Sequence, residues 1–487
     1  MDIAFRRPMK ETSIPLPTTQ NESGQAEWTD QNDIFLVSDL HIADGRTTPF
    51  GKFTQGENFF WDETFQRFVT KICSNEGDRS RTLIVNGDFF DFLRVNRIPR
   101  QKSQEDVRLV SRWKKFLETI EHTAAAWDLY AADKSEKEYG FKTQDYKSVW
   151  RILLIFEGHK VFFRALRGFL GRGENRLIIM KGNHDLELFW EAVRQAFVYF
   201  LADEDPERYN ELNARIRFYQ QSVVINKELY VEHGHRYEEI THTDRDTRSE
   251  NPRELDLPVG SLFNRYVINK IEEIDPLFDN IKPPTNILKA VALHYPGKLL
   301  RIAGYHLVGA WKIVRKYHVA YAAKIVGNII KVCLPFLVFL GLAMVLYVGL
   351  KRSIVDDLGR WLVNAVGSLV GAFTVRWIQQ HLFGSGETES LLRNAQEVYR
   401  SVPSVRLITF GHTHASEMSL IGGDCWYVNS GTWIPTIELE THAVQDTNTF
   451  CVLRLSNDNG MFQREPLLRW DDGLQSLEPM IFLAPSA

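Results

Sequence analysis

Five short apolar runs of this chain each end abruptly in a polar cluster whose side chains can bind a metal ion. The runs are bounded by Gly, Asp or Asn, a pattern typical of buried strands in layered α/β proteins. In such proteins the functional site lies beyond the carboxyl ends of the strands, so the five clusters can converge on one place. The clusters begin at Ser38, Asn86, Lys181, His233 and Gly411.

The residue types in these clusters favour metal-assisted hydrolysis. A lone DxH or HxH pair is more often a solvated turn, but five clusters at strand ends favour a common metal site. Two divalent cations about 3.5–4 Å apart can bind both the attacking and the leaving oxygen of a phosphoryl transfer, and they lower the pKa of a bound water. Mixed nitrogen and oxygen ligands favour Mn, with Fe or Zn as alternatives, over Mg or Ca. The candidate residues are Asp39, His41, Asp88, Asn183, His184, Asp185, His233, His412 and His414.

The ordered blocks DxH, GD, GNHD, HGH and GHTH resemble the calcineurin-like metallophosphoesterase superfamily over roughly residues 33–94, 176–236 and 404–434. The resemblance implies an α/β fold, a two-sheet sandwich flanked by helices. It implies two metal sites that share Asp88 as a bridge. The first site would add Asp39, His41 and His414, and the second would add Asn183, His233 and His412.

The same resemblance implies catalytic roles for two further residues. His184 would contact the substrate phosphate and protonate the leaving oxygen, with Asp185 holding the His184 ring in the required tautomer. Asp91 is either a hydrogen-bond partner behind the ligands or a charge at a helix N-terminus, and the role of His235 is open. His159 belongs to no motif, and its replacement by alanine is expected to do little.

Within the superfamily, the blocks GDFFDFL and GNHD argue against the protein Ser/Thr phosphatases, which carry GDxxDRG and GNHE. Together with HGH and GHTH followed by YVNSGTW, they look more like the branch that includes UDP-2,3-diacylglucosamine hydrolases. This chain is far longer than those enzymes, which leaves its substrate open.

The 487 residues divide into a core with two insertions. We expect a flexible tail at residues 1–30 without a secretory signal, and a core made of residues 31–260 and 385–487. A helical insertion covers about residues 95–150. Its amphipathic helix, expected at residues 104–127, is either a cap over the site or a packing appendage.

The second insertion, residues 281–381, has the composition of a membrane-associated segment. It contains no acidic residue up to Val355, and its basic residues lie among aromatic and aliphatic ones. The uncharged run at residues 332–350 is long enough to span a bilayer. Because His412 must reach the same metals as Asp88, a second crossing is needed, for which residues 361–375 are the candidate. A spanning hairpin is favoured over an interfacial anchor, with the catalytic domain on the cytoplasmic side.

The overall charge and cysteine content narrow the classes of function. A net charge of −4 argues against nucleic acid as a partner, and four separated cysteines fit a reducing compartment. We therefore expect a membrane-anchored phosphoesterase of a phosphate or pyrophosphate ester, with a lipid-linked ester as one candidate substrate. The alternatives are a phosphodiesterase of a soluble substrate that is only anchored at the membrane, and a catalytically silent binding scaffold.

Overall fold

The structure is a computed structural model of the whole chain. It describes residues 25–47, 52–54, 56–74, 79–238, 240–272, 386–434, 436–437, 444–445, 449–458 and 461–480. Residues 1–281 and 390–487 form one compact unit, and residues 282–389 form a second. The expected hydrophobic segments at residues 332–350 and 361–375 lie outside the described residues. Among the residues that are described, no helix is both long and apolar enough to cross a membrane.

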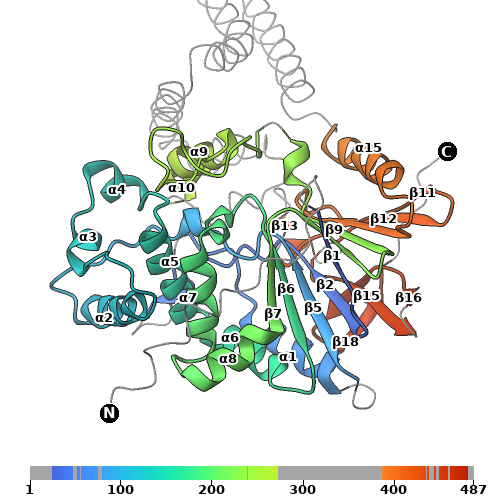
Figure 1. The fold of residues 1–487 in the computed structure, drawn as a ribbon, viewed down its shortest axis with the longest axis horizontal. Coiled ribbons are helices and arrows are strands. Elements are labelled where there is room, and N and C mark those ends of the chain that lie inside the picture. The colour runs from blue at the N-terminus through green and yellow to red at the C-terminus, as the bar shows by residue number, and fades with distance from the viewer. Residues whose placement is uncertain are drawn as a thin grey trace, which may run out of the picture. The chain divides into compact units, whose positions relative to one another are not determined.

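Two mixed β-sheets form the centre of the first unit (Figure 1). The larger sheet has the strand order β18-β17-β15-β2-β5-β6-β7, with β16 also paired to β15. Its strands are β2 (Asp33–Val37), β5 (Arg81–Asn86), β6 (Arg176–Met180), β7 (Ile216–Tyr219), β15 (Cys451–Asp458), β16 (Met461–Arg464), β17 (Leu468–Asp471) and β18 (Ser476–Pro479). The smaller sheet has the order β1-β8-β9-β10-β12-β11. Its strands are β1 (Gln25–Trp28), β8 (Ser222–Ile225), β9 (Leu229–Glu232), β10 (Leu407–Phe410), β11 (Glu417–Gly422) and β12 (Cys425–Asn429).

Each of the central strands β2, β5 and β6 contains a continuous apolar run, because both faces of the larger sheet are covered. In β2, Ile34 and Leu36 point into a core shared with Val231 and Leu407 of the smaller sheet. Phe35 points the other way, into the core formed with the helices. The sheets therefore pack face to face, as expected for the two-sheet sandwich.

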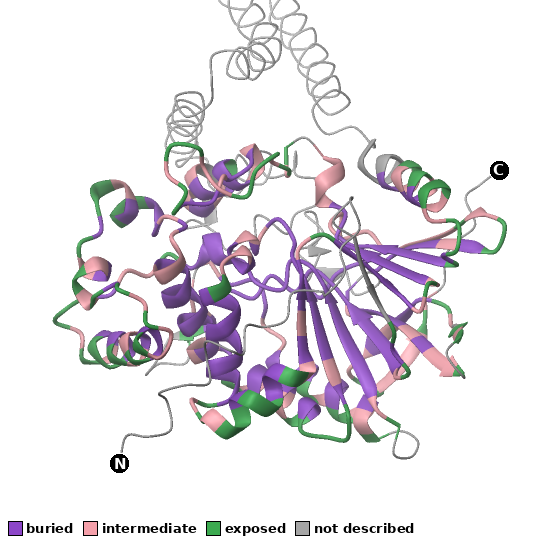
Figure 2. Ribbon diagram, viewed as in Figure 1, coloured by how far each residue is buried: buried purple, intermediate pink, exposed green. Residues whose placement is uncertain are grey.

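Helices cover the outer face of each sheet and complete a four-layer arrangement. The larger sheet packs against α1 (Asp62–Ser74), α5 (Asp145–Gly158), α6 (Lys160–Leu170) and α7 (Glu191–Leu201). The smaller sheet packs against α15 (Gly386–Ser401) through Leu391, Ala395 and Val398. Figure 2 shows the strands of both sheets as largely buried between these layers. The mixed α/β fold with two sheets and flanking helices is therefore confirmed.

The first insertion is helical, as expected, but its helix is shorter than predicted. Helix α2 (Gln104–Thr119) is capped at its N-terminus by Ser103, whose hydroxyl accepts a hydrogen bond from the Asp106 backbone N–H. It is followed by α3 (Ala126–Tyr130) and α4 (Lys134–Tyr139). Trp113 and Phe116 are buried, whereas Val107 is 48% exposed.

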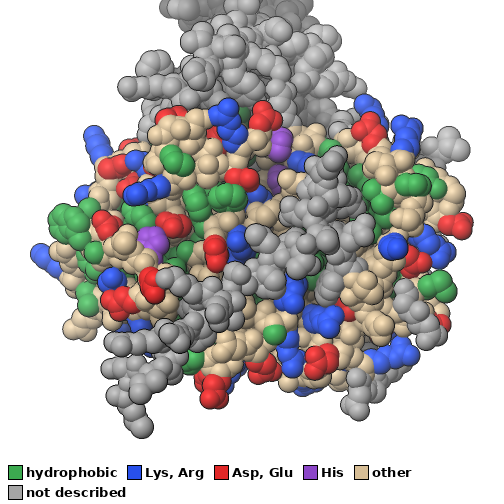
Figure 3. Space-filling view, in the orientation of Figure 1, with side chains coloured by type: hydrophobic (Ala, Val, Ile, Leu, Met, Phe, Trp, Pro, Cys, Tyr) green, Lys and Arg blue, Asp and Glu red, His purple; other side chains and the backbone are tan. Residues whose placement is uncertain are grey.

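The remaining elements are short or lie at the edges of the unit. They are β3 (Arg46–Thr47), β4 (Lys52–Phe53), α8 (Pro206–Arg215), α9 (Val259–Phe263), α10 (Asn269–Glu272), β13 (Thr436–Ile437) and β14 (Val444–Gln445), with the 3-10 turns η1 (Phe92–Arg94), η2 (Leu186–Phe189) and η3 (His235–Tyr237) and a π-helical turn, η4 (Asn264–Ile268). On the face drawn in Figure 3, basic and acidic side chains of the described residues lie interspersed. This distribution fits the near balance of 58 basic and 62 acidic residues.

Candidate metal centre

The ligand clusters follow five strands whose carboxyl ends meet at one side of the sandwich. Strands β2, β5 and β6 are parallel neighbours in the larger sheet, and β9 and β10 are parallel neighbours in the smaller one. The two sheets are joined at these ends, where the His412 backbone N–H donates to the Asp39 carboxylate at 3.2 Å. The predicted convergence of the clusters on one place is therefore what the structure shows.

One group of donor atoms comprises Asp39, His41 and His414, whose ligand atoms lie within 4.8 Å of one another. The Nε2 atoms of His41 and His414 are 3.1 Å apart, and Asp39 Oδ1 lies 3.3 Å from His414 Nε2. Two ring nitrogens this close cannot both point a hydrogen at each other, so at least one presents its lone pair. The group offers both nitrogen and oxygen donors to a cation.

A second group comprises Asp88, His233 and His412, also within 4.8 Å of one another. His233 Nδ1 lies 2.8 Å from the Asn86 carbonyl, which can only accept, so Nδ1 carries the hydrogen and Nε2 keeps its lone pair. Among the described residues, Asn183 Oδ1 is buried without a hydrogen-bond partner. Buried polar atoms usually have partners, so this unpaired oxygen fits a metal ligand set.

Asp88 belongs to the second group and also lies close to the first. Its Oδ2 atom is 3.1 Å from His233 Nε2 and 3.7 Å from His41 Nε2. Its Oδ1 atom instead accepts a hydrogen bond from the His184 backbone N–H at 2.8 Å. One carboxylate oxygen thus faces both groups, which is the position that the bridging role requires.

Burial and close opposite charges shift the pKa values of these groups strongly. Burial alone would raise the pKa of Asp39. Hydrogen bonds to His41 and His414 outweigh the effect of burial and hold the pKa of Asp39 well below its usual range. Asp88 behaves in the same way beside His233 and His184. Burial lowers the pKa of His41, but hydrogen bonding to Asp39 and Asp91 raises it to about 10. The site therefore keeps buried carboxylates ionised, as cation binding needs.

The backbone at the ligands is held in an uncommon conformation. Left-handed φ values occur at Asp39 (56°), His41 (50°), Asp88 (48°), His412 (73°) and His414 (60°). Such a conformation costs of the order of 1–3 kcal/mol per non-glycine residue and clusters at functional sites. Asp and His tolerate it better than most residues do.

Two glycines in the motifs are explained by close approach. A Cβ atom on Gly182 would lie 2.1 Å from Asp88 Oδ1, and one on Gly411 would lie 2.6 Å from Asp39 Oδ2. The glycine that precedes the ligand in GNHD and in GHTH therefore leaves room for a carboxylate from another strand end.

The carboxylate that orients His184 is Asp91, so the expected role of Asp185 is wrong. His184 Nδ1 lies 2.9 Å from Asp91 Oδ2, and Arg94 Nε lies 2.8 Å from the same oxygen. Asp185 instead accepts from the backbone N–H groups of Gly182 at 2.6 Å and Phe89 at 2.8 Å. It joins the loops after β6 and β5, and has no direct contact with the His184 ring in the described hydrogen bonds.

This arrangement leaves His184 suited to proton transfer. Burial lowers the pKa of His184, but the charges of Asp91 and Asp88 outweigh it and raise the pKa. Because Nδ1 faces the Asp91 carboxylate, Nε2 is the nitrogen left to face a ligand. The side chain is 22% exposed, whereas that of Asp91 is fully buried. Of the two alternatives for Asp91, the hydrogen-bond partner agrees with the structure, and its side chain makes no cap hydrogen bond to η1.

The motifs assigned no role to two residues that lie beside the second group. The His235 ring centroid lies 5.4 Å from that of His233 and 6.4 Å from that of His412, and its buried Nδ1 has no hydrogen-bond partner among the described residues. Burial and the neighbouring His233 hold the pKa of His235 well below its usual range. Glu238, which belongs to no motif, places Oε2 3.0 Å from His412 Nε2.

His159, expected to be dispensable, is fully buried between two carboxylates. Its Nδ1 lies 2.7 Å from Asp62 Oδ1 and its Nε2 lies 2.9 Å from Glu57 Oε2. It occupies the junction between α5 and α6. Both carboxylates would lose this partner if His159 were replaced, so the structure indicates a role in stability that the motifs did not. The expected small effect on activity stays a prediction.

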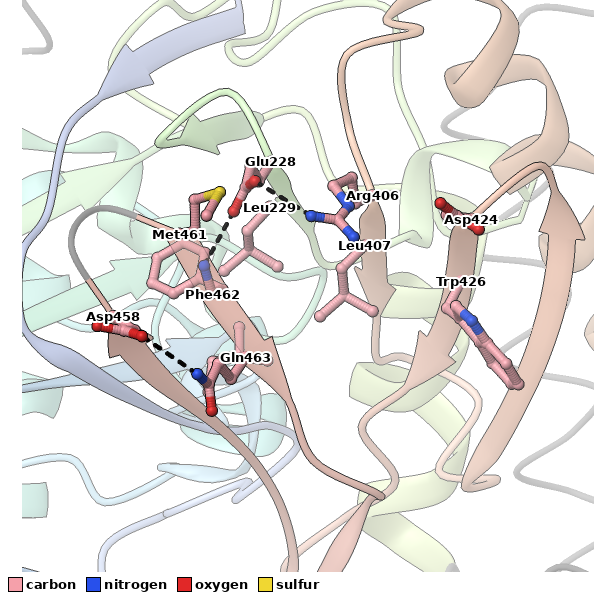
Figure 4. A pocket seen from close by; sticks show the side chains of 11 residues that line it. Glu228, Leu229, Arg406, Leu407, Asp424, Trp426, Asp458, Met461, Phe462 and Gln463 are labelled. Carbon is pink, nitrogen blue, oxygen red and sulfur yellow. Dashed lines mark hydrogen bonds and ion pairs between the residues drawn. The ribbon is translucent and has the colours of Figure 1, made fainter.

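A cavity of about 520 Å³ lies elsewhere, at the amino ends of β9, β10 and β12, and Figure 4 shows the side chains that line it. None of the predicted ligands lines this cavity.

No protein-family model matches the chain, and neither a curated protein nor a solved structure is detectably similar to it. The functional argument therefore depends on the geometry of the metal centre.

Proposed function

We propose that this protein is a metal-dependent phosphoesterase of the calcineurin-like type. The observation that carries the proposal is the position of Asp88 Oδ2, which faces both donor groups. Asp39, His41 and His414 would hold one divalent cation, and Asn183, His233 and His412 the other, with Asp88 shared. Mn is the expected metal, with Fe or Zn as alternatives. When bound, two such ions supply an activated water and neutralise charge on the phosphoryl group.

The residues around the ligands support a division of labour in this reaction. His184 would donate a proton from Nε2 to the leaving oxygen, because its other nitrogen is engaged by Asp91. Asp91 would act as a positioning residue, held in turn by Arg94. Asp185 would keep the loops after β5 and β6 together, so that Asp88 and His184 keep their relative position.

We further propose that the enzyme is anchored at a membrane and acts on a phosphate or pyrophosphate ester, with a lipid-linked ester as one candidate substrate. The support comes from the sequence, in which the basic and apolar insertion follows His233 and precedes His412. An acylated substrate could keep its chains in the bilayer. Each buried CH₂ group would contribute about 0.8 kcal/mol to binding.

Hydrolysis of an aryl phosphate by the purified protein with added Mn tests the reaction class. Asp88→Asn and His184→Ala should each lower kcat at least about a hundredfold, as expected on losing the bridging ligand or the proton donor. His122→Gln is the matched control, since His122 also pairs with a carboxylate but belongs to the first insertion. Full activity in both site variants would refute the site assignment. A panel of lipid-linked and soluble phosphoesters would then test the substrate class.

A further inference from the structure

We propose that Glu238 is a positioning residue of the second metal site, where it holds the His412 ring with Nδ1 directed at the cation. The proposal rests on the proposed function, because it assigns a partner to one of the proposed ligands. Glu238 lies outside every motif block on which the metal-site prediction was based.

The hydrogen bond between the two side chains decides which nitrogen of His412 is available. Glu238 Oε2 lies 3.0 Å from His412 Nε2. A carboxylate oxygen accepts, so Nε2 carries the hydrogen and Nδ1 keeps its lone pair. Glu238 is absent from the group formed by Asp88, His233 and His412, so it stands behind His412 rather than among the donors. Carboxylates in this position fix the tautomer and orientation of metal-binding histidines.

The segment around Glu238 is fixed to the strands that carry the ligands. It follows His233 through Gly234, whose φ of 104° is open to glycine but strained for other residues. The Tyr237 ring lies 5.5 Å from that of Phe410, two residues before His412, and its hydroxyl donates to Glu232 at 3.0 Å. The backbone carrying Glu238 is therefore anchored to both β9 and β10.

Packing alone does not account for a carboxylate at this position. The Glu238 side chain is only 13% exposed. Its second oxygen, Oε1, is buried without a hydrogen-bond partner among the described residues. Burial of a carboxylate is costly unless it is paired, and the only side chain that pairs with it in the described structure is His412.

Titration of the metal-free full-length protein with Mn²⁺, with bound metal measured by equilibrium dialysis, tests this role without an activity assay. Wild type should bind two equivalents. Glu238→Ala should weaken one equivalent about 10–100-fold and leave the other unchanged, as is typical when the partner of a metal-bound histidine is lost. Glu238→Gln should recover part of the affinity, because its amide oxygen can still accept from Nε2.

A matched control is available at the amino end of β9, the opposite end of this strand from His233. Glu228 lines the cavity in Figure 4, where its carboxylate accepts from the Phe462 backbone N–H at 2.9 Å and lies 3.6 Å from Arg406. Its side chain is 17% exposed, close to the value for Glu238. Glu228→Ala should therefore leave both Mn²⁺ affinities at the wild-type values.

The outcomes separate the role of Glu238 from the proposed function. Two wild-type Mn²⁺ affinities in both Glu238 variants would overturn the role of Glu238 and leave the metal centre intact. Failure of wild type to bind Mn²⁺, Fe²⁺ or Zn²⁺ would overturn both proposals. If Glu238→Ala does not fold, as judged by circular dichroism, Glu238→Gln decides: weakened binding at one site supports the role, and unchanged binding refutes it.

Discussion

Replacing His159 with glutamine should destabilise the protein, although this residue lies outside the metal centre. Its two ring nitrogens face Asp62 and Glu57, and all three side chains are buried. Glu57 also accepts from the backbone N–H groups of Gly45 at 2.6 Å and Phe59 at 2.7 Å. His159 thus ties the α5–α6 junction to the loop that follows Asp39 and His41.

The size of the effect follows from the charge of His159. Burial lowers its pKa, but the charges of Glu57 and Asp62 outweigh it and raise the pKa from 6.5 to about 10. At about 1.4 kcal/mol per pKa unit, the pair of carboxylates stabilises the charged ring by about 5 kcal/mol. Removing one partner of a buried ion pair costs a similar amount, about 3–5 kcal/mol.

The pH dependence separates a charge effect from a packing effect. A raised folded-state pKa contributes stability that is fully present below the unfolded value of 6.5 and is lost as pH rises toward 10. The difference in unfolding free energy between wild type and His159→Gln should therefore shrink by about 1.4 kcal/mol per pH unit in this window. Urea titrations followed by tryptophan fluorescence at pH 6, 7.5 and 9 measure it.

His122→Gln is the matched control, because His122 pairs with Asp145 at 3.1 Å but the two side chains are 22% and 32% exposed. Its effect should stay below about 1 kcal/mol, as is usual for pairs near the surface. A stability difference for His159→Gln that is the same at pH 6 and pH 9 would refute the charge argument.

Three further predictions concern the site and the anchor. Asp91→Asn should lower kcat about 10²–10⁴-fold in steady-state assays by disturbing the His184 tautomer, and a change in KM alone would contradict this role. Gly182→Ala should weaken Mn²⁺ binding at least about tenfold in dialysis, because overpacking against Asp88 costs about 1–3 kcal/mol; Gly168→Ala, which meets nothing within 4 Å, should not. The protein should sediment with membranes and resist alkaline carbonate if residues 332–350 and 361–375 form a hairpin, whereas release by salt would favour an interfacial anchor.

The strands and the convergence of the clusters could be predicted because their signals are local. A strand buried on both faces reads as a continuous apolar run, and β2, β5, β6, β9 and β10 all lie where such runs predicted them. The position of each cluster is then set by the strand that directly precedes it in the sequence. The two-sheet arrangement of the sandwich was instead implied by the family resemblance, because strand periodicity alone does not determine how the strands pair.

The pairing of each histidine with a particular carboxylate could not be assigned from the sequence, because it is set by tertiary packing. Asp185 is next to His184 in sequence, yet Asp91, 93 residues away, orients the ring. Glu238 and His412 are separated by 174 residues, and no motif links them. His159 looked like any polar residue in a helical stretch, because its carboxylates come from the segment around residues 57–62.

The left-handed backbone conformation at five proposed ligands lowers the stability of the folded protein, although the same residues serve the proposed metal site. Each such residue costs of the order of 1–3 kcal/mol that the surrounding core must offset. A cation that binds only the folded chain would return part of that free energy. Selection for stability alone would favour glycine at these positions, so a descendant that lost its metal could unfold at a higher temperature than its active ancestor. Selection for activity would therefore maintain Asp or His at all five positions.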